Sequence, residues 1–436
     1  MSAPATGLVH TVCAMRDDQL ASDADAQAGL AHVAAASFLA SRVVPTGGYA
    51  VALAGGAALA RAAQLAGLRM GYGASIAAML QSIAVLGPSR FSIPLTQAAS
   101  APLLGRLHLR GAHLATQFGA CAGIRATDQA LFTLFYIWIV GGVDAYAATY
   151  DALIGRISGI PDGTTAALVA TALALLLWAV SASIVQVLTY RAALRAWPAE
   201  PAVAAATAAA AREHPPRDDA ATAVRRPPPR YDPRAVAVAA IVAFCVLLAT
   251  TAWVVLGAVA AWLAIAWLTA RADPAPVRAG LAFAVLLGGG ALAFGLVGGI
   301  TLELTLQRAL RAALLVLVAT WLRAAAGEQG VREIARRSLL RVRRVPAMAE
   351  AAYVLDRLGA GGALGASGHA LVAEVRHVRR RPRALARAVL RWIAAEADRF
   401  KAPAPAPAPP ALRAGWADRA VVAAVIALVS GAVLVQ

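Results

Sequence analysis

The side chains best suited to chemistry in this sequence are polar and ionisable groups embedded in long apolar stretches. Four of them lie near the start of the apolar stretch 301–322: Glu303, Gln307, Arg308 and Arg311. Because an ionisable side chain inside a bilayer is costly, such residues usually face a protein interior or a water-filled cavity. They are candidates for an intramembrane polar site, unless the membrane boundary falls after Arg311 and leaves them at the interface.

A second candidate site lies in the segment 87–107. It contains three prolines: Pro88, Pro94 and Pro102. Proline lacks the backbone N–H that bonds the carbonyl four residues earlier, so a proline inside a span requires another donor for that carbonyl. The segment is interpreted either as a broken or re-entrant helix that lines a cavity, or as a cytoplasmic loop with a short interfacial helix. In the first case, the residues that face a small ligand are Ser92, Thr96 and Gln97.

The sequence contains no recognisable motif of an enzyme active site. The sequence contains no Walker A, HExxH, GxSxG or CxxC pattern, which leaves nucleotide hydrolysis, zinc peptidase, hydrolase and thiol redox activities without support. Its cysteines, Cys13, Cys121 and Cys245, lack metal-ligand spacing. His108 and His113 lie in a basic loop, where two solvated histidines are a simpler interpretation than a metal pair. We expect no catalytic, cofactor-binding or metal site, and a protein that is not an enzyme.

A helical membrane scaffold must position these residues. Of the 436 residues, 60% are apolar and 14% charged, whereas soluble domains average about 45–50% apolar and about 25% charged residues. A bilayer core of about 30 Å takes about 20 apolar helical residues, and the chain contains about nine or ten such spans. The expected spans lie at 42–61, 69–90, 129–150, 162–191, 235–251, 253–270, 279–300, 303–322 and 419–436, with 29–44 as a weaker candidate. The predicted fold class is all-α, a polytopic helical membrane protein with additional amphipathic cytoplasmic helices.

Two arginine-rich inserts define the topology and the domain boundaries. They cover 191–234 and 323–419, and their flanks are predicted to be cytoplasmic because arginine near span ends is retained on that side. An N-terminal membrane domain of about five or six spans (1–200) is followed by a disordered linker rich in Ala, Pro and Arg (201–230) and a second membrane domain (231–436). The N-terminus is acidic where a secretory signal is basic. We therefore expect an intact multi-pass protein of the plasma (inner) membrane.

The second insert contains segments with amphipathic helical spacing. Six arginines lie between Arg332 and Arg344, with apolar residues three apart between them. Pro346 ends this helix and begins another, which stops at Gly359, and a third segment follows at 383–399. Basic amphipathic helices bind anionic lipid surfaces or dock onto a soluble partner, and the sequence leaves both open.

Residues 229–436 resemble the transmembrane T component of energy-coupling factor transporters, the cobalt and biotin permease type. The resemblance rests on four features in order: Tyr231-Asp232-Pro233-Arg234 before a two-span hairpin, the helix ITLELTLQRALRAALLVLVATWL, the segment RRVPAMAEAAYVLDRLG and a final single span. Members of that family carry an Arg-x-Ile-Pro segment, a following glutamate and an Ala-Arg-Gly signature, which ends a cytoplasmic coupling helix that docks on an ATPase subunit.

The resemblance implies coupling residues in this chain. Arg344, Pro346 and Glu350 match the first part of the family pattern. Arg357 and Gly359 stand where the Ala-Arg-Gly signature is expected, although the local sequence is Asp-Arg-Leu-Gly. Arg387 lies in an Ala-Arg-Ala sequence that corresponds to a second signature without its glycine. The coupling helices are accordingly expected at 331–362 and 383–399.

The function that the resemblance implies is that of a membrane subunit of an importer driven by ABC-type ATPase subunits. Such a subunit transmits ATPase movement to a membrane unit that binds a small molecule, a vitamin or a metal ion. Residues 1–200 would sit where the substrate-binding S component sits, unless a separate substrate-binding membrane subunit is the partner. The alternative is a non-transport integral membrane scaffold whose basic insert binds anionic lipid. Neither interpretation involves nucleic acid, and copurification of an ATPase would separate them.

The topology is testable by cysteine labelling in intact cells. A cysteine introduced at Ala208 or Ala404 in a cysteine-free background should resist an impermeant thiol reagent, because the flanks of both inserts are predicted to be cytoplasmic. A cysteine at Thr301, in a turn predicted to lie outside, is the matched positive control. Labelling at Ala208 or Ala404 in sealed cells would overturn the topology.

Overall fold

The computed structural model describes residues 27–42, 48–88, 92–154, 162–197, 231–270, 274–342, 344–378, 382–400 and 415–434. Every regular element in these ranges is helical, which confirms the predicted all-α class. The helices are 27–42, α2 (Gly48–Leu86), α3 (Ser92–Leu109), α4 (Leu114–Phe135), the π-helix η2 (Tyr136–Gly141), α5 (Val143–Leu153), α6 (Gly163–Arg195), α9 (Pro233–Ala249), α10 (Trp253–Thr269), α11 (Pro274–Val297), α12 (Leu302–Arg341), α13 (Pro346–Arg357), α14 (Gly361–Val378), α15 (Pro382–Arg399) and α16 (Trp416–Leu434). The expected linker 201–230 lies outside the described residues.

Fewer helices than expected have the length and composition of a membrane span. Within the described residues four qualify, or up to five if the bent pair of α4 and α5 forms one span: Gly48–Leu86, Gly163–Arg195, Val277–Val297 and Leu302–Arg341. The expected hairpin at 235–270 forms two helices of 17 residues each. A helix of that length is about 26 Å long, shorter than a bilayer core of about 30 Å. Composition and length thus suggest a membrane protein, and the count of nine or ten spans is not confirmed.

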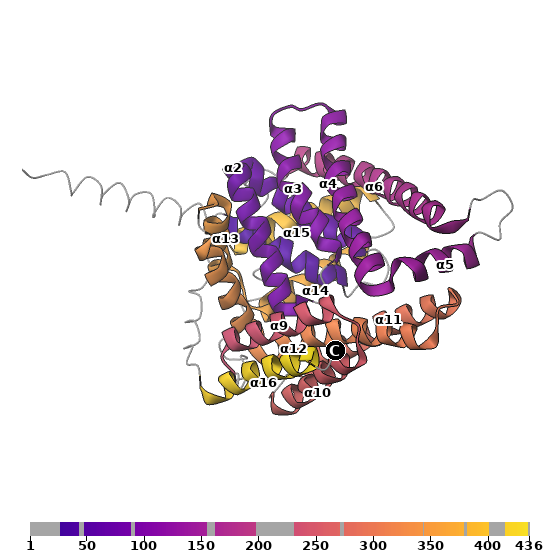
Figure 1. Cartoon of the computed structure of the whole chain (residues 1–436). Helices are drawn as coiled ribbons and strands as arrows, with labels where there is room; N and C mark the ends of the chain where they lie inside the picture. Colours follow the sequence, from indigo (N-terminus) through magenta and orange to yellow (C-terminus); the bar gives the residue numbers. More distant parts are fainter. Residues whose placement is uncertain are drawn as a thin grey trace, which may run out of the picture.

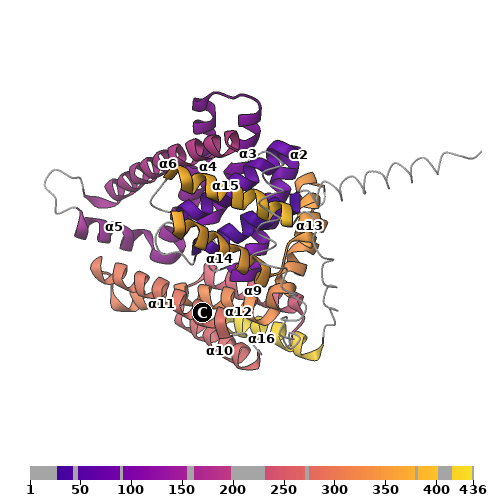
Figure 2. The ribbon, with the colours of Figure 1, turned by 180° about the vertical axis from the view of Figure 1, so that it is seen from behind.

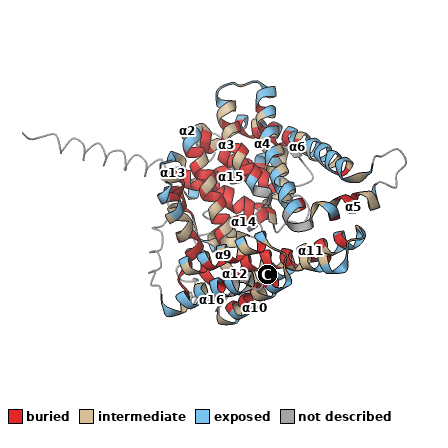
Figure 3. Cartoon of the chain, viewed as in Figure 1, coloured by how far each residue is buried: buried red, intermediate tan, exposed pale blue. Residues whose placement is uncertain are grey.

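The helices form two groups that lie against each other (Figures 1 and 2). The N-terminal group contains α2, α3, α4 and α6, and the C-terminal group contains α9, α10, α11, α12 and α16. α13 runs beside α2, while α14 and α15 cross the rear of the N-terminal group (Figure 2). Buried residues concentrate in the middle of the molecule, whereas α6 and α11 are largely exposed (Figure 3). Their exposed faces carry large apolar side chains such as Leu177, Trp178 and Val285, which suits an apolar surrounding.

α2 consists of two helical arms that meet at Gly67. The φ of Gly67 is 85°, in the left-handed region that favours glycine. The chain bends so sharply there that a Cβ at Gly71 would collide with Ala63. The expected spans 42–61 and 69–90 therefore appear as the first arm, 48–66, and the second arm, 68–86.

α3 lies against both arms of α2 and is a continuous helix despite Pro102. Pro102 has no N–H for the carbonyl of Ala98, four residues earlier. The hydroxyl of Ser75, on the second arm, donates a hydrogen bond of 2.5 Å to that carbonyl. The hydroxyl of Tyr72 bonds the next carbonyl, that of Ala99, at 3.0 Å. The expected replacement donor is therefore present, and residues 92–107 form a continuous helix packed on α2, while 89–91 lie outside the described residues.

The helix 27–42, expected as a weak span candidate, is enclosed by protein. His32 stacks on Phe400 with ring centroids 3.6 Å apart and bonds the Ser367 hydroxyl of α14 at 3.0 Å. Ser367 in turn donates a bond of 2.5 Å to Glu396 of α15. Burial lowers the pKa of His32 to about 3, so this histidine is neutral at physiological pH. A helix that is apolar all round is typically buried in this way.

Hydrogen bonds join the starts of α9 and α16 in the C-terminal group. The side chain of Asp232 accepts a 2.8 Å bond from the backbone N–H of Arg234, and Pro233 occupies the first helical turn. The backbone N–H of Asp232 donates a 2.6 Å bond to Asp418 of α16. The Asp-Pro-Arg sequence that contributed to the family resemblance thus caps a helix and ties together two segments far apart in the chain.

The Ser75 bond yields a test of this packing. Ser75→Ala should destabilise the protein, because a buried carbonyl left without a donor costs about 1–3 kcal/mol. Adding Pro102→Ala should recover most of the loss, since the substituted alanine supplies the missing N–H. Ser82→Ala is the matched control, because the Ser82 hydroxyl bonds a carbonyl of its own helix turn. Thermal unfolding in detergent measures all three, and equal losses for Ser75→Ala with and without Pro102 would refute the explanation.

Candidate functional site

Eight side chains from four helices meet inside the N-terminal group, and we call them the polar centre. They are Tyr49 of α2, Gln97 and Ser100 of α3, Cys121 and Arg125 of α4, and Ser183, Gln186 and Tyr190 of α6. All except the half-buried Tyr49 are buried. On each of α3, α4 and α6 these residues are three or four positions apart, so they share one helix face.

Arg125 connects three helices of the polar centre. Its guanidinium donates to the side-chain oxygen of Gln186 and, at 3.3 Å, to the hydroxyl of Tyr49. It also lies over the Tyr49 ring, 5.6 Å from the centroid. Gln186 extends the hydrogen-bond network to α3, because its amide donates a 2.7 Å bond to the hydroxyl of Ser100.

Tyr190 reaches the polar centre because Gly56 leaves space for it. The Tyr190 hydroxyl donates a 2.5 Å bond to the side-chain oxygen of Gln97. A Cβ at Gly56 would overlap that hydroxyl. A glycine on the first arm of α2 is therefore required for the bond between α6 and α3.

The predicted ligand-facing residues are only partly brought together. Gln97 belongs to the polar centre. Thr96 is buried beside it and donates a 2.5 Å bond to Asp128 of α4. Ser92 is the first residue of α3, and its side chain lies outside the described set. The structure thus places Thr96 and Gln97 in the protein interior.

A second polar cluster joins α13 to the second arm of α2. Glu350, buried on α13, pairs with Arg69. α13 approaches the arm closely at Gly73, where a Cβ would lie 2.9 Å from the Cβ of Glu350 and 3.2 Å from the backbone nitrogen of Ala351. The helices can meet at this distance because the arm presents a glycine there.

α12 joins the same cluster through Glu328 and Gln81. The amide of Gln81 donates to the side chain of Glu328 at 3.2 Å and to the carbonyl of Gly359 at 3.1 Å. Glu328 also accepts a 2.7 Å bond from the backbone N–H of Gly361. The turn between α13 and α14 is therefore held from both α2 and α12.

Much of the arginine-rich part of α12 is engaged within the protein. Arg332 is buried and donates to the carbonyl of Leu355. Arg336 and Arg337 pair with the buried Glu333. Burial raises the pKa of Asp356 on α13, and Arg336, 3.7 Å away, opposes that rise. Charge in this region therefore helps to fix α13 on α12 and is not all available to a lipid surface.

The coupling residues predicted from the family resemblance divide into two sets. Arg344 is exposed in the turn before α13, Pro346 is exposed as the first residue of α13, and Arg357 is half-buried at its end. Glu350 and Gly359 face the interior, where they contact α2 and His32 respectively. Glu350 and Gly359 thus take part in internal contacts, and the coupling role of the whole set stays a prediction.

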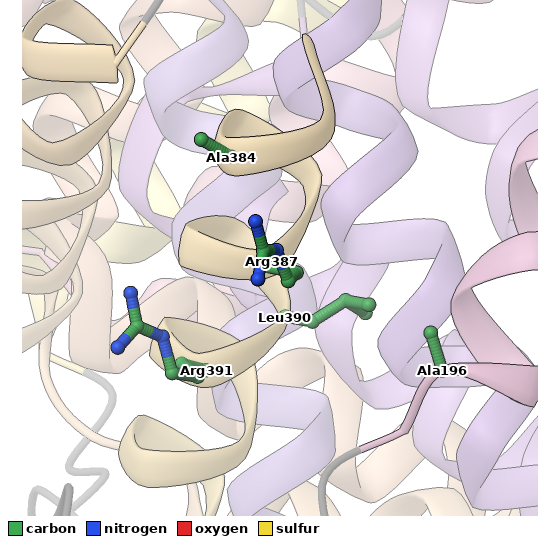
Figure 4. A pocket seen from close by; sticks show the side chains of 5 residues that line it. All are labelled: Ala196, Ala384, Arg387, Leu390 and Arg391. Carbon is green, nitrogen blue, oxygen red and sulfur yellow. The ribbon is translucent and has the colours of Figure 1, made fainter. Parts of the chain in front are cut away.

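Arg387, the remaining predicted coupling residue, lines a pocket of about 460 Å³ between α15 and the end of α6. The pocket is bordered by Ala196, Ala384, Leu390 and a second arginine, Arg391. Both arginines project from successive turns of α15, while Leu390 is directed toward Ala196 (Figure 4). Two exposed guanidinium groups at one pocket favour an anionic group there.

The four polar residues at the start of α12 have different surroundings. Arg311 is buried, whereas Gln307 and Arg308 are half-buried. The guanidinium of Arg308 occupies the space where a side chain at Gly142 would lie. Glu303 is exposed and accepts a 3.2 Å bond from the ring N–H of Trp253. The four therefore do not form one enclosed site, because the helix carries Glu303 to the surface.

Comparisons with models of protein families, with curated proteins and with solved structures found no match. In the described residues no group of three or more His, Cys, Asp or Glu side chains has the arrangement of a metal site. The polar centre and the α2–α13 interface are therefore the features of this structure that bear on function.

Arg125 and the α6 residues of the polar centre were not singled out from the sequence. Arg125 lies in an apolar stretch of α4, and Gln186 lies in a stretch without charge. The available signal is weak: a single arginine in an apolar helix, and Ser183, Gln186 and Tyr190 at helical spacing in another. Only the packing of α4 against α6 shows that these polar faces meet.

The close approach at Gly73 is testable. Gly73→Leu should lift α13 from the second arm, because overpacking of this kind costs about 1–3 kcal/mol, which corresponds to roughly 5- to 150-fold faster hydrogen exchange of α13 amides. Gly119→Leu is the matched control, since nothing lies within 4 Å of a Cβ at that position of α4. Unchanged exchange in Gly73→Leu would show that the interface does not depend on this contact.

Proposed function

We propose that this chain is the membrane subunit of an importer of the energy-coupling factor type. It transmits movement of cytoplasmic ABC-type ATPase subunits to a site that binds a small molecule. The observation that carries the proposal is a continuous series of buried contacts from α13 to the polar centre. The resemblance of residues 229–436 to T components and the four apolar helices of spanning length support the class of protein.

The first step of the contact series lies between α13 and the second arm of α2. Their backbones approach at Gly73, and the pair of Arg69 with Glu350 adds a charged contact across the same interface. Leu355 and Leu358 are buried against the core, so α13 is anchored by its apolar face. A force on α13 would therefore act directly on the second arm.

The second step passes from this arm through α3. The arm bonds the carbonyls of Ala98 and Ala99, and the residues on either side of them, Gln97 and Ser100, belong to the polar centre. Because a helix moves nearly as a rigid body, displacement of the arm would shift Gln97 and Ser100 relative to Arg125. Such contiguity supports coupling without measuring it.

Gly67 supplies the hinge in this proposal. It joins the arm that contacts α13 to the arm that carries Tyr49, and no atom lies within 4 Å of the place where its Cβ would be. Hinges are few residues that absorb large backbone changes. Gly67 itself therefore does not obstruct a change in the angle of the second arm, although the arms lie close together at Gly71 and Ala63.

The ATPase would dock on the turn between α12 and α13. Arg341 and Arg344 are exposed there, and so are the apolar side chains of Val342 and Val345. A basic turn with exposed apolar groups suits an acidic partner surface with an apolar groove. In this arrangement the turn and both arginine-rich inserts lie on the cytoplasmic side of the plasma membrane.

A second candidate function is the non-transport scaffold that binds anionic lipid through its insert. The observation that favours it is the pocket beside Arg387 and Arg391, which suits a phosphate headgroup. The exposed apolar residues of the α12–α13 turn would also enter a lipid interface readily.

Copurification separates the two candidates. Arg341→Ala and Arg344→Ala should each reduce recovery of an ATPase with Walker sequences from the native host roughly ten- to a hundredfold, because a charge-assisted contact is worth about 1.5–3 kcal/mol. Arg376→Ala, an exposed arginine of α14, is the matched control and should have no effect. Absence of an ATPase under all conditions, with equal small losses of binding to anionic vesicles for all three variants, would reject the importer and favour the scaffold.

A further inference from the structure

Arg125 is a buried cation without an anionic partner. Only 3% of its surface is exposed, and no ion pair within the described part of the chain involves it. Elsewhere in the same structure, the buried carboxylates Glu333 and Glu350 are both paired with arginines. Arg311 and Arg332 are likewise buried without an ion pair in the described residues. An uncompensated buried charge costs several kcal/mol, so the surroundings of Arg125 call for an explanation.

The groups around Arg125 supply acceptors that are neutral. They are the side-chain oxygen of Gln186 and the hydroxyl of Tyr49, and both bond the same terminal nitrogen of the guanidinium. The Nε of Arg125 has no hydrogen-bond partner in the described residues. A carboxylate would instead bond a terminal nitrogen and Nε together in the forked geometry that arginine favours.

Two further donors of the polar centre also lack partners. They are the amide nitrogen of Gln97 and the hydroxyl of Ser183, and both residues are fully buried. Ser183 lies one helical turn from Gln186, and Gln97 is joined to α6 through Tyr190. Polar hydrogens from α3, α4 and α6 thus make no hydrogen bond of normal geometry in one interior region, which buried polar groups rarely tolerate. Gln97 lies near the Tyr49 hydroxyl and Ser183 near the Cys121 thiol.

We propose that the polar centre binds the carboxylate of a small organic monoanion. A carboxylate supplies the missing negative charge and the missing acceptor atoms at once. A ligand with one negative charge matches this site, because Arg125 is the only Arg, Lys or His among the eight residues of the polar centre. A doubly charged phosphate would leave one of its charges uncompensated. In the ligand-free protein, Gln186 and Tyr49 stand in for the carboxylate oxygens.

Tyr49 is placed to cover the bound anion. Its hydroxyl also donates a 3.0 Å bond to the carbonyl of Ala182 on α6, and its ring packs beside Trp178. Tyr49 is only half-buried and lies at the start of the first arm, far along α2 from the hinge at Gly67. Displacement of Tyr49 would open the polar centre toward α6 and expose Arg125 to a ligand.

The anion site rests on the proposed importer function for its physiological role, but the binding test does not require an ATPase. The purified chain in detergent is titrated with benzoate and followed by thermal stability and by tryptophan fluorescence, to which Trp178 contributes. We expect a saturable response to benzoate and none to benzamide, its neutral counterpart. Chloride and inorganic phosphate are titrated in parallel.

The variants separate the charge of Arg125 from its role in folding. Arg125→Met should weaken benzoate binding at least tenfold, whereas Arg106→Met, a half-exposed arginine of α3, should leave it unchanged. Gln186→Glu places a carboxylate within reach of Arg125, so it should raise the unfolding temperature and abolish the benzoate response. This variant keeps the test decisive if Arg125→Met does not fold.

Several outcomes would overturn the inference. They are no saturable response to benzoate, an equal response to benzamide, saturation by chloride or phosphate in place of benzoate, or native binding by Gln186→Glu. Failure of benzoate binding with an ATPase still recovered on the chain would reject the anion site and leave the importer standing. Benzoate binding without any ATPase would do the reverse.

Discussion

The structure depends on the requirement that α3, an apolar helix enclosed by its neighbours, satisfies its polar groups within the protein. Pro102 removes one donor from that helix, and Ser75 replaces it. The replacement bond specifies how the second arm of α2 lies against α3, because a shift by one residue would leave the Ala98 carbonyl without a donor. With that face of α3 directed at the arm, Gln97 and Ser100 on either side are directed toward α4 and α6.

The buried glutamates around α12 and α13 are paired with arginines, whereas the described structure shows no ion pair in the polar centre. Around α12 and α13, Glu333 and Glu350 are matched by arginines, so charge contributes to holding the insert on α2. In the polar centre, Arg125 is surrounded by neutral acceptors instead. The first solution favours one fixed geometry, whereas the second leaves an electrostatic demand that a ligand can meet. Under the proposed function, this contrast assigns structural support to the insert and ligand binding to the N-terminal group.

Glycine residues make the close contacts in the polar centre and at the α2–α13 interface sterically possible. Gly56 leaves space for the Tyr190 hydroxyl, and Gly73 allows α13 to approach the second arm. In an alanine-rich chain, such positions are hard to distinguish by composition, since most neighbouring residues are also small. Their effect depends on the partner helix that packs on them, and that partner is more than a hundred residues away in both cases.

The all-helical class, the apolar stretches and the helices within the insert follow from the sequence alone, because helical periodicity, charge-free length and proline positions are local properties. The need for a donor at the Ala98 carbonyl was likewise implied by Pro102. The sequence did not determine that 27–42 is enclosed by α14 and α15, that Glu350 and Gly359 face inward, or that Arg125 lies among neutral groups. Those outcomes depend on which helix faces meet, and in a chain so uniformly apolar many pairings bury similar area. Tertiary packing decided among them through a few polar bonds and glycine contacts that join distant segments.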